Sequence, residues 1–309
     1  MAAYNSKEFE SRFPSKEIAL DFIEKLRGLT LKDISLNELD ELIDEVFHMI
    51  PFSLGTIPKD TLLYRARVNE KNKHFLHLDQ LTLRKHEDVK SFGRANQPGE
   101  SIFYCSTNMN LACGEVLQDM RYSFQPKYEA GFATVSVWKT VEELRVAPIY
   151  YSEKAAKVRK DIAAYKEGNR KQVRDWNHVS HATLDVSDLI MEFFCDEFSK
   201  SEINNEDDYK FSVSYTRRLQ HANTLIAPEY IKEKFDGIVY PSVALKFAGD
   251  NVSLFDDELY SKIKFETAYE VLCTHFDFEI GTLNSFFLHE IESIDADNNI
   301  VWKKTMYGQ

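Results

Sequence analysis

The chain has 309 residues, a mass of 35.9 kDa and a formal net charge of -12. Such a length can bury a full hydrophobic core, so folding requires no disulfide or metal staple. The acidic balance disfavours sequence-independent contact with nucleic acid, which needs clustered Lys and Arg, but it allows a local basic pocket for a small phosphorylated ligand.

The cysteines and the N-terminus bear on the compartment. Cys105, Cys113, Cys195 and Cys273 are widely spaced and form no CxxC pair, so we expect reduced thiols in the core. The N-terminus lacks an apolar signal segment, and no run of about 18 apolar residues occurs. These features predict a cytoplasmic protein without membrane contact, and they suit a bacterial protein of defence or regulation.

The first stretch, to about residue 58, is predicted to be helical. The sequence Ser-Leu-Asn-Glu at 35–38 reads as a capping box, and Pro51 ends the helix that follows it. Its apolar face consists of Leu36, Leu39, Leu42, Ile43, Val46, Phe47 and Ile50. We expect this face to pack against the rest of the domain or against a partner, without a catalytic role.

From Thr61 the pattern changes to short strands separated by helices. Strands are predicted at 62–68, 101–106, 131–138 and 237–240, with two more, or a hairpin, over about 267–293. Helices are predicted at about 110–122, 152–167, 185–200 and 207–223. The fold class is therefore α+β. We expect one catalytic domain over residues 59–309, with a helical insertion at about 140–230 and an N-terminal helical extension over residues 1–58.

Arg65 and Arg67 are placed on one face of the otherwise apolar strand 62–68. A guanidinium that faces the interior needs an anionic partner to offset its lost hydration. The partner is either the pyrophosphate of a ligand or a carboxylate of the protein, and these two residues alone leave both alternatives open.

A turn-rich loop and the strand and helix after it supply the next candidates. The loop Gly93-Arg94-Ala95-Asn96-Gln97-Pro98-Gly99 has the composition of an ordered, ligand-presenting turn. Tyr104 follows in a strand and Glu115 near the start of a helix. An aromatic ring can stack on nicotinamide, and a carboxylate can stabilise an oxocarbenium-like ribose. Taken singly, Tyr104 also fits a core residue and Glu115 a solvated charge.

The segment Asp236-Gly237-Ile238-Val239-Tyr240-Pro241-Ser242 reads as a buried strand that ends in a proline-constrained turn. No GxSxG elbow surrounds Ser242, so a hydrogen-bonding role is favoured over acyl transfer. Asn251, shortly after Gly249, either caps a loop or contacts a ligand.

Two histidine pairs have a spacing of three, which would place both members on one face if the segments were helical. The pairs are His178 with His181 and His74 with His77. Neither pair has a third ligand at a diagnostic spacing, so we expect no metal site.

Several segments follow one another in this order: Leu63-Tyr64-Arg65-Ala66-Arg67, Gly93-Arg94-Ala95-Asn96, Tyr104, Glu115, and Tyr240-Pro241-Ser242 followed by Asn251. Together they resemble the RES domain family. The resemblance spans about residues 61–256. It implies a fold similar to the ADP-ribosyltransferase toxins, with a central β core and flanking helices. It also implies activity on NAD as substrate, with no prosthetic group, and a toxin that is covered by an antitoxin protein.

The resemblance also implies roles for individual residues. Arg65 and Arg94 would bind the NAD phosphates or position the ribose, with Arg67 as a neighbour. Tyr104 would pack on the nicotinamide side and Glu115 would stabilise the ribosyl cation. The remaining two, Ser242 and Asn251, would hold the ligand. The chain departs from the family pattern in two places. Ala95 stands where many short members have Trp, and a long segment is inserted between Glu115 and Ser242.

The leading hypothesis is cleavage of the nicotinamide N-glycosidic bond of NAD by hydrolysis or by phosphorolysis, with inorganic phosphate as co-substrate. The alternative enzyme is an ADP-ribosyltransferase that modifies a protein. An alternative of another class is a non-catalytic nucleotide-binding or interaction module. The sequence leaves the acceptor, the antitoxin and the oligomeric state open, and direct contact with nucleic acid is not expected.

Overall fold

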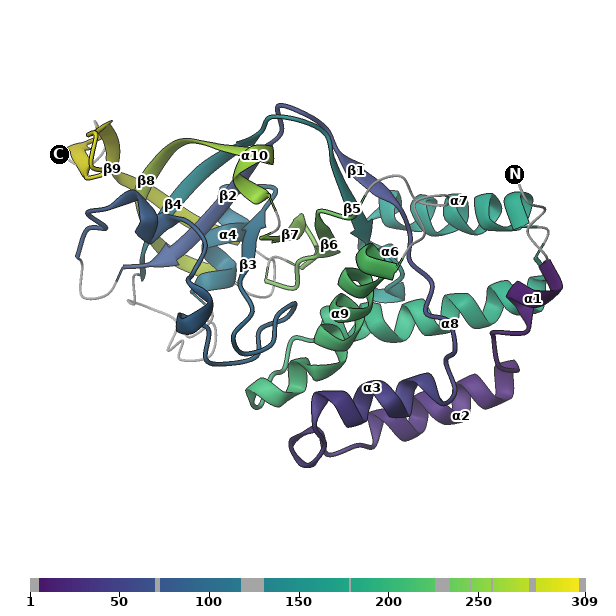
Figure 1. Ribbon diagram of the computed structural model, residues 1–309. Coiled ribbons are helices and arrows are strands. Elements are labelled where there is room, and N and C mark those ends of the chain that lie inside the picture. The colour runs from purple at the N-terminus through teal and green to yellow at the C-terminus, as the bar shows by residue number, and fades with distance from the viewer. Residues whose placement is uncertain are drawn as a thin grey trace. The chain divides into compact units, whose positions relative to one another are not determined.

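The computed structural model describes residues 6–69, 73–117, 131–177, 179–225, 234–244, 246–256, 258–277 and 282–305 (Figure 1). The chain forms two compact units. The helical unit comprises Met1–Leu54, Ser91–Pro98 and Ala147–Lys232, and the sheet unit comprises Gly55–Lys90, Gly99–Val146 and Glu233–Gln309. Within the described ranges, no helix has both the length and the apolar character needed to cross a membrane.

The sheet unit is built on a ten-stranded sheet with the order β1-β5-β6-β7-β3-β2-β4-β8-β9-β10. The strands are β1 (Gly55–Ile57), β2 (Leu62–Val68), β3 (Ile102–Ser106), β4 (Gly131–Thr140), β5 (Leu144–Pro148), β6 (Gly237–Pro241), β7 (Asp250–Phe255), β8 (Ile263–Asp277), β9 (Thr282–Ile294) and β10 (Ile300–Lys304). Its short helices are η3 (Leu78–Leu81), η4 (His86–Asp88), α4 (Met109–Val116) and α10 (Leu259–Lys262).

The sheet has a seam between β2 and β3. β2 pairs antiparallel with β4 along its whole length, from Leu62↔Lys139 to Val68↔Ala133. With β3, by contrast, the described residues of β2 share the single pair Tyr64↔Ser106. Because the ladder is not continued there, the two strands are joined at one point and side chains must satisfy backbone groups on either side of it.

α4 covers one face of the sheet. Its residues Leu111, Ala112 and Cys113 are buried together with Ala66 of β2 and Val135 of β4. Side chains alternate along a strand, so the residues next to Ala66, Arg65 and Arg67, belong to the opposite face. The predicted placement of both arginines on one face is therefore confirmed.

The helical unit contains the N-terminal segment together with the long middle segment of the chain. Its helices are α1 (Ser6–Glu10), α2 (Lys16–Arg27), η1 (Leu31–Asp33), α3 (Leu36–Asp44), α6 (Glu153–Val158), α7 (Lys160–Asn177), α8 (His181–Phe198), η5 (Glu206–Tyr209) and α9 (Lys210–Leu225). α8 packs against α2 and α9, and α9 packs against α3. The core includes Phe193, Phe194 and Phe198 of the predicted apolar stripe, and the last two contact the ring of Tyr215 of α9.

The structure confirms the α+β class and the predicted strands at 62–68, 101–106, 131–138 and 237–240 within a few residues. The capping box is also present: Ser35 accepts from the Glu38 amide, and the Glu38 carboxylate accepts from the Ser35 amide at 2.8 Å. The predicted helix was too long, however, because α3 ends at Asp44 and the buried Phe47 and Ile50 follow it outside the helix. Residues 118–122 of the predicted helix 110–122 lie outside the described part.

Four strands were not predicted, namely β1, β5, β7 and β10. β7 matters most for the site, because it places Asn251 between Ser106 of β3 and Tyr240 of β6 and not in a loop. All four cysteines are buried and free, as expected.

Gly237 at the start of β6 is a site where any side chain would collide with the sheet. A Cβ there would lie 2.2 Å from the Ser253 carbonyl oxygen and 2.9 Å from the Leu254 Cα. We expect Gly237→Ala to lower the free energy of unfolding by about 2 kcal/mol or more, because backbone atoms must move. Urea denaturation measures this change in the free energy of unfolding.

Gly168 in α7 provides the control. No heavy atom lies within 4 Å of a Cβ built there, and alanine is the better helix former by roughly 0.5–1 kcal/mol. Gly168→Ala should therefore be neutral or stabilising. Equal destabilisation by the two substitutions would contradict the close approach of β6 and β7.

Candidate functional site

Glu115 is the centre of a hydrogen-bond network that joins α4 to β6, β7 and β3. The Ser242 hydroxyl donates to Glu115 Oε1 at 2.5 Å, and the Asn251 side-chain amide donates to the same oxygen at 2.9 Å. The Ser106 hydroxyl in turn donates to Asn251 Oδ1 at 2.8 Å, which fixes the orientation of that amide. Three predicted residues far apart in sequence are thus brought together.

Glu115 is the last residue but one of α4, so the prediction that it lies near the start of a helix is wrong. Contacts at the other end of the helix hold α4 in place. The Asn108 side chain caps the helix by accepting from the Leu111 amide at 2.8 Å. The turn before β7 approaches this end of the helix at Gly249, where a Cβ would lie 3.0 Å from Asn108 Nδ2 and 3.1 Å from Leu111 Cδ2. A glycine at this position therefore lets the turn lie directly against α4.

Ser242 is held at the start of the turn that joins β6 to β7. Its amide donates to the Gly249 carbonyl, and its carbonyl accepts from the Phe247 amide. Lys246 and Phe247 adopt left-handed backbone angles, φ 49° and 66°, which close the turn at a cost in strain. The side chain is 0% exposed and its oxygen also accepts from the Ala244 amide, so the hydroxyl proton is directed at Glu115.

The network leaves the Glu115 carboxylate with one oxygen held and one oxygen available. Ser242 and Asn251 both donate to Oε1, and a carboxylate can accept both bonds. No hydrogen bond from the described residues reaches Oε2, and the side chain is half-buried. Such a group can place negative charge beside a cationic centre without reorganising first.

Tyr104 lies on the same sheet face as this network, because it alternates with Ser106 along β3. Its side chain is half-buried, so part of the ring faces solvent. Its backbone carbonyl accepts a hydrogen bond from the Arg65 guanidinium at 2.9 Å across the seam between β2 and β3. The Arg65 side chain therefore bridges β2 to the backbone of β3 across this seam.

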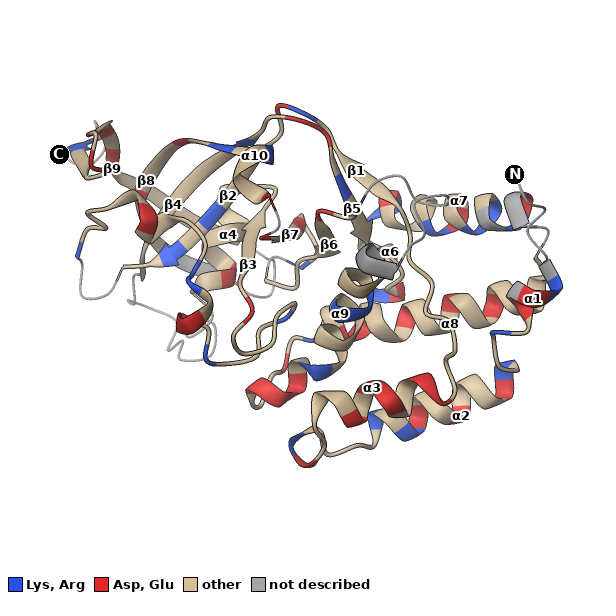
Figure 2. Ribbon diagram, in the orientation of Figure 1, with Lys and Arg blue, Asp and Glu red and all other residues tan. Residues whose placement is uncertain are grey.

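Arginines gather on the opposite face of β2, where Figure 2 shows blue within an otherwise mostly tan strand. Arg65 is buried and packs over the Phe103 ring at 4.9 Å, and Arg67 donates to the Thr82 carbonyl at 2.6 Å. The Nε atoms of both are buried without a hydrogen-bond partner. No Asp or Glu among the described residues pairs with either arginine, nor with the nearby Arg84.

This uncompensated positive charge alters the titration of both arginines. Burial, with a contribution from Arg67, lowers the pKa of Arg65 to about 9. Burial and the charge of Arg84 lower the pKa of Arg67 to about 10. Both groups stay protonated at neutral pH, so the protein holds desolvated cations that an anionic ligand would stabilise.

Arg94 belongs to the helical unit, and its guanidinium is engaged there. It donates to the Phe198 carbonyl at 2.7 Å and to the Lys200 carbonyl at 3.3 Å, at the C-terminal end of α8. A cation at this end of a helix meets unpaired carbonyls and the negative end of the helix dipole. The ring of Tyr209 lies 5.3 Å from the same guanidinium. The structure thus gives Arg94 a helix-capping contact and does not join it to the Glu115 network.

Two contributors were missed from the sequence. Ser106 orients Asn251, and its alternation with Tyr104 in one strand was the signal that could have indicated a shared face. Arg84 adds to the arginine group, but it lies in an exposed segment of irregular structure that carries no pattern. The condition for His74 and His77 to share a helix face is not met, because residues 73–76 are not helical; His178 lies outside the described residues.

Comparison with known proteins adds one finding. The family model described as the RES domain matches residues 62–272, which includes β2, α4, β6 and β7. No curated protein matches the chain. The matched range therefore contains the whole Glu115 network and both arginines of β2.

The arginine group predicts binding of a compact polyanion. Inorganic pyrophosphate should raise Tm, since a ligand at a hundred times its Kd stabilises the folded state by about 2.7 kcal/mol. Arg65→Met should remove this shift, because it deletes the buried charge while keeping an apolar side chain. Differential scanning fluorimetry measures both.

Arg12→Met serves as the control, because Arg12 is an exposed residue paired with Glu8. It should leave the pyrophosphate shift unchanged. A shift of the same size in Arg65→Met would place the anion elsewhere.

Proposed function

The chain belongs to the RES domain family, and we propose that it is an enzyme that cleaves the nicotinamide N-glycosidic bond of NAD. One observation carries the proposal: a carboxylate held by two donors through a single oxygen lies on the domain that also holds Arg65 and Arg67, which pair with no Asp or Glu of the described ranges. A dinucleotide offers the complementary charges, a pyrophosphate anion and a ribose that becomes cationic as the bond breaks.

In this proposal Glu115 acts on the ribose. As nicotinamide leaves with the bonding electrons, positive charge develops at the anomeric carbon, and Glu115 Oε2 stabilises it. Ser242 and Asn251 act through Glu115, because both bond to its other oxygen and keep the carboxylate fixed. The half-buried Tyr104 ring packs against the nicotinamide side on the same face.

Arg65 and Arg67 hold the pyrophosphate. Arg65 and Arg67 belong to the face of β2 opposite to that of Glu115, so their role at the pyrophosphate stays a prediction; Arg65 bridges to the Tyr104 carbonyl at the seam. The acceptor that completes the reaction is water or inorganic phosphate, and phosphate would require one of these cations near the anomeric carbon. The role of Arg94 at the NAD phosphates stays a prediction.

An enzyme of this kind consumes a central metabolite. We therefore propose that the protein is a toxin in the cell and that an antitoxin protein restrains it. The alternative in which ADP-ribose is transferred to a protein side chain uses the same carboxylate and the same cleavage step, with a different acceptor.

Glu115→Gln tests the proposal. The glutamine oxygen still accepts from Ser242 and Asn251, but the negative charge is lost, so kcat for nicotinamide release should fall about 10²- to 10⁴-fold with NAD affinity largely kept. Purified protein is incubated with NAD, with and without inorganic phosphate, and nicotinamide is followed by chromatography.

Glu292→Gln is the matched control, since Glu292 is an exposed residue of β9. The Glu292→Gln variant should release nicotinamide at the same rate as the wild type. Dependence of release on phosphate identifies phosphorolysis, and labelled ADP-ribose on protein identifies transfer. If folded wild-type protein binds NAD but neither releases nicotinamide nor labels protein, the binding-module alternative replaces the enzyme.

Ser242→Ala separates positioning from direct binding. Removal of the 2.5 Å hydrogen bond to Glu115 should lower kcat about ten- to a hundredfold, the value of a hydrogen bond to a charged group, with little change in KM. A rise in KM at unchanged kcat would show that the hydroxyl contacts NAD instead. Steady-state kinetics with NAD make the distinction.

A further inference from the structure

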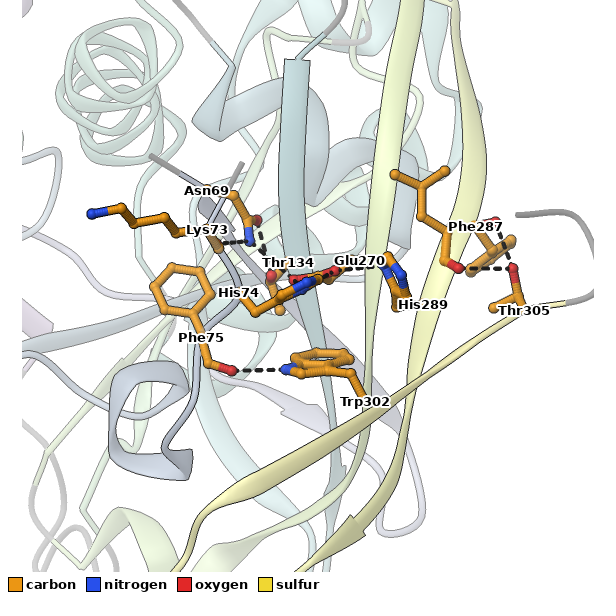
Figure 3. A network of polar contacts seen from close by, with 11 residues as sticks. Asn69, Lys73, His74, Phe75, Thr134, Glu270, Phe287, His289, Trp302 and Thr305 are labelled. Carbon is orange, nitrogen blue, oxygen red and sulfur yellow. Dashed lines mark hydrogen bonds and ion pairs between the residues drawn. The ribbon is translucent and has the colours of Figure 1, made fainter. Parts of the chain in front are cut away.

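A second cluster of polar side chains lies on the sheet face opposite α4, apart from the Glu115 network (Figure 3). It consists of His74, which follows β2, Glu270 of β8 and His289 of β9. Glu270 and His289 are direct cross-strand partners, so their side chains share this face. The potential ligand atoms of the three residues all lie within 4.8 Å of one another.

Both imidazoles present Nδ1 to one carboxylate. His74 Nδ1 lies 2.8 Å from each oxygen of Glu270, and His289 Nδ1 lies 2.8 Å from Glu270 Oε2. A tetrahedral ion with bonds of about 2.0–2.2 Å holds its ligand atoms about 3.3 Å apart. The two Nδ1–oxygen distances of 2.8 Å would therefore lengthen by about 0.5 Å to admit an ion.

The orientation of His289 distinguishes this cluster from an ordinary hydrogen-bonded triad. Its Nδ1 is buried and makes no hydrogen bond, although Glu270 Oε2 is 2.8 Å away, because the oxygen lies off the donor direction. Ligands of one cation point to a common centre and not at each other. An ion at that centre would satisfy the buried nitrogen.

The surroundings hold the carboxylate and one imidazole in place, as Figure 3 shows. The Asn69 amide donates to Glu270 Oε1 at 3.3 Å and to the Lys73 carbonyl at 2.9 Å, and it is itself oriented by the Thr134 hydroxyl. The Trp302 ring stacks on the His74 ring, with 6.4 Å between the two ring centroids. Such outer partners orient the ligands of metal sites.

The charge balance also calls for a cation. The Glu270 side chain is 9% exposed, and no Lys or Arg among the described residues pairs with it. An imidazole provides positive charge only when it is protonated, whereas a divalent ion provides it at neutral pH. His74 is 45% exposed, which leaves a path for the ion and for a water ligand.

We propose that His74, Glu270 and His289 bind one Zn²⁺, with water as the fourth ligand. Two nitrogens and one carboxylate oxygen suit zinc, whereas Mg²⁺ and Ca²⁺ take oxygen ligands. The ion fastens the segment after β2 to β8 and β9. The absence of a metal motif in the sequence is explained by spacing, since the three ligands come from three distant segments that only the sheet brings together.

The test uses full-length protein treated with a chelator and then titrated with Zn²⁺. We expect one tightly bound Zn²⁺ per chain by elemental analysis and a rise in Tm that the chelator reverses and Mg²⁺ does not reproduce. His289→Gln should weaken zinc binding at least a hundredfold. Co²⁺ in place of zinc should show the absorption of a tetrahedral site, lost in the same variant.

His86→Gln is the matched control. His86 Nε2 also lies 2.8 Å from a carboxylate, that of Asp256, but among the residues that the structure describes this pair has no third ligand. The His86→Gln variant should bind zinc with the same affinity as the wild type. Equal stabilisation by Zn²⁺ and Mg²⁺, or unchanged zinc affinity in folded His74→Gln and His289→Gln proteins, would overturn the proposal and leave a hydrogen-bonded triad. Because the zinc-to-magnesium comparison needs no variant, it decides the question even if a substitution prevents folding.

Discussion

The position of α4 against the sheet is the constraint on which the site depends. The helix is held by apolar packing against β2, β4 and β8 and by the polar contacts of Glu115 to β6 and β7. The packing fixes where the helix lies, and the hydrogen bonds fix how it is rotated. Because the Ser242 hydroxyl and the Asn251 amide are buried, they would be left unsatisfied if the carboxylate moved away. The same bonds that orient Glu115 therefore also stabilise the fold.

The sheet separates negative from positive charge. Glu115 lies on the face covered by α4, and Arg65 and Arg67 belong to the other face, so neither arginine is neutralised by the carboxylate. The cost is visible in the lowered pKa values of both arginines, which follow from burial without an acidic partner. Proteins retain such uncompensated charge where a ligand supplies the counter-ion.

The sequence predicted the strands and helices whose patterns are local, and the family resemblance singled out Glu115, Ser242 and Asn251, although not the hydrogen bonds that join them. β7 was missed, since Asp250 and Asn251 at its start resemble a turn, and only pairing with β3 and β6 makes this segment a strand. The helix after Ser35 was predicted too long, because its apolar periodicity continues through Phe47 while the backbone leaves the helix after Asp44. The metal-ligand cluster was not predictable, since cross-strand register, and not spacing, joins Glu270 to His289.

The arginines of β2 and the cluster of His74, Glu270 and His289 are connected along one row of the sheet. In register, Arg67 lies opposite Thr134 of β4, which lies opposite Glu270 of β8, which lies opposite His289 of β9. This row crosses the face opposite α4 and carries a cation at one end and the proposed zinc ligands at the other. Asn69, one residue beyond β2, bonds to Glu270, so the carboxylate anchors the end of the strand that carries both arginines. A fixed end limits how far Arg65 and Arg67 can move toward solvent, and burial of their charge then persists until an anion arrives.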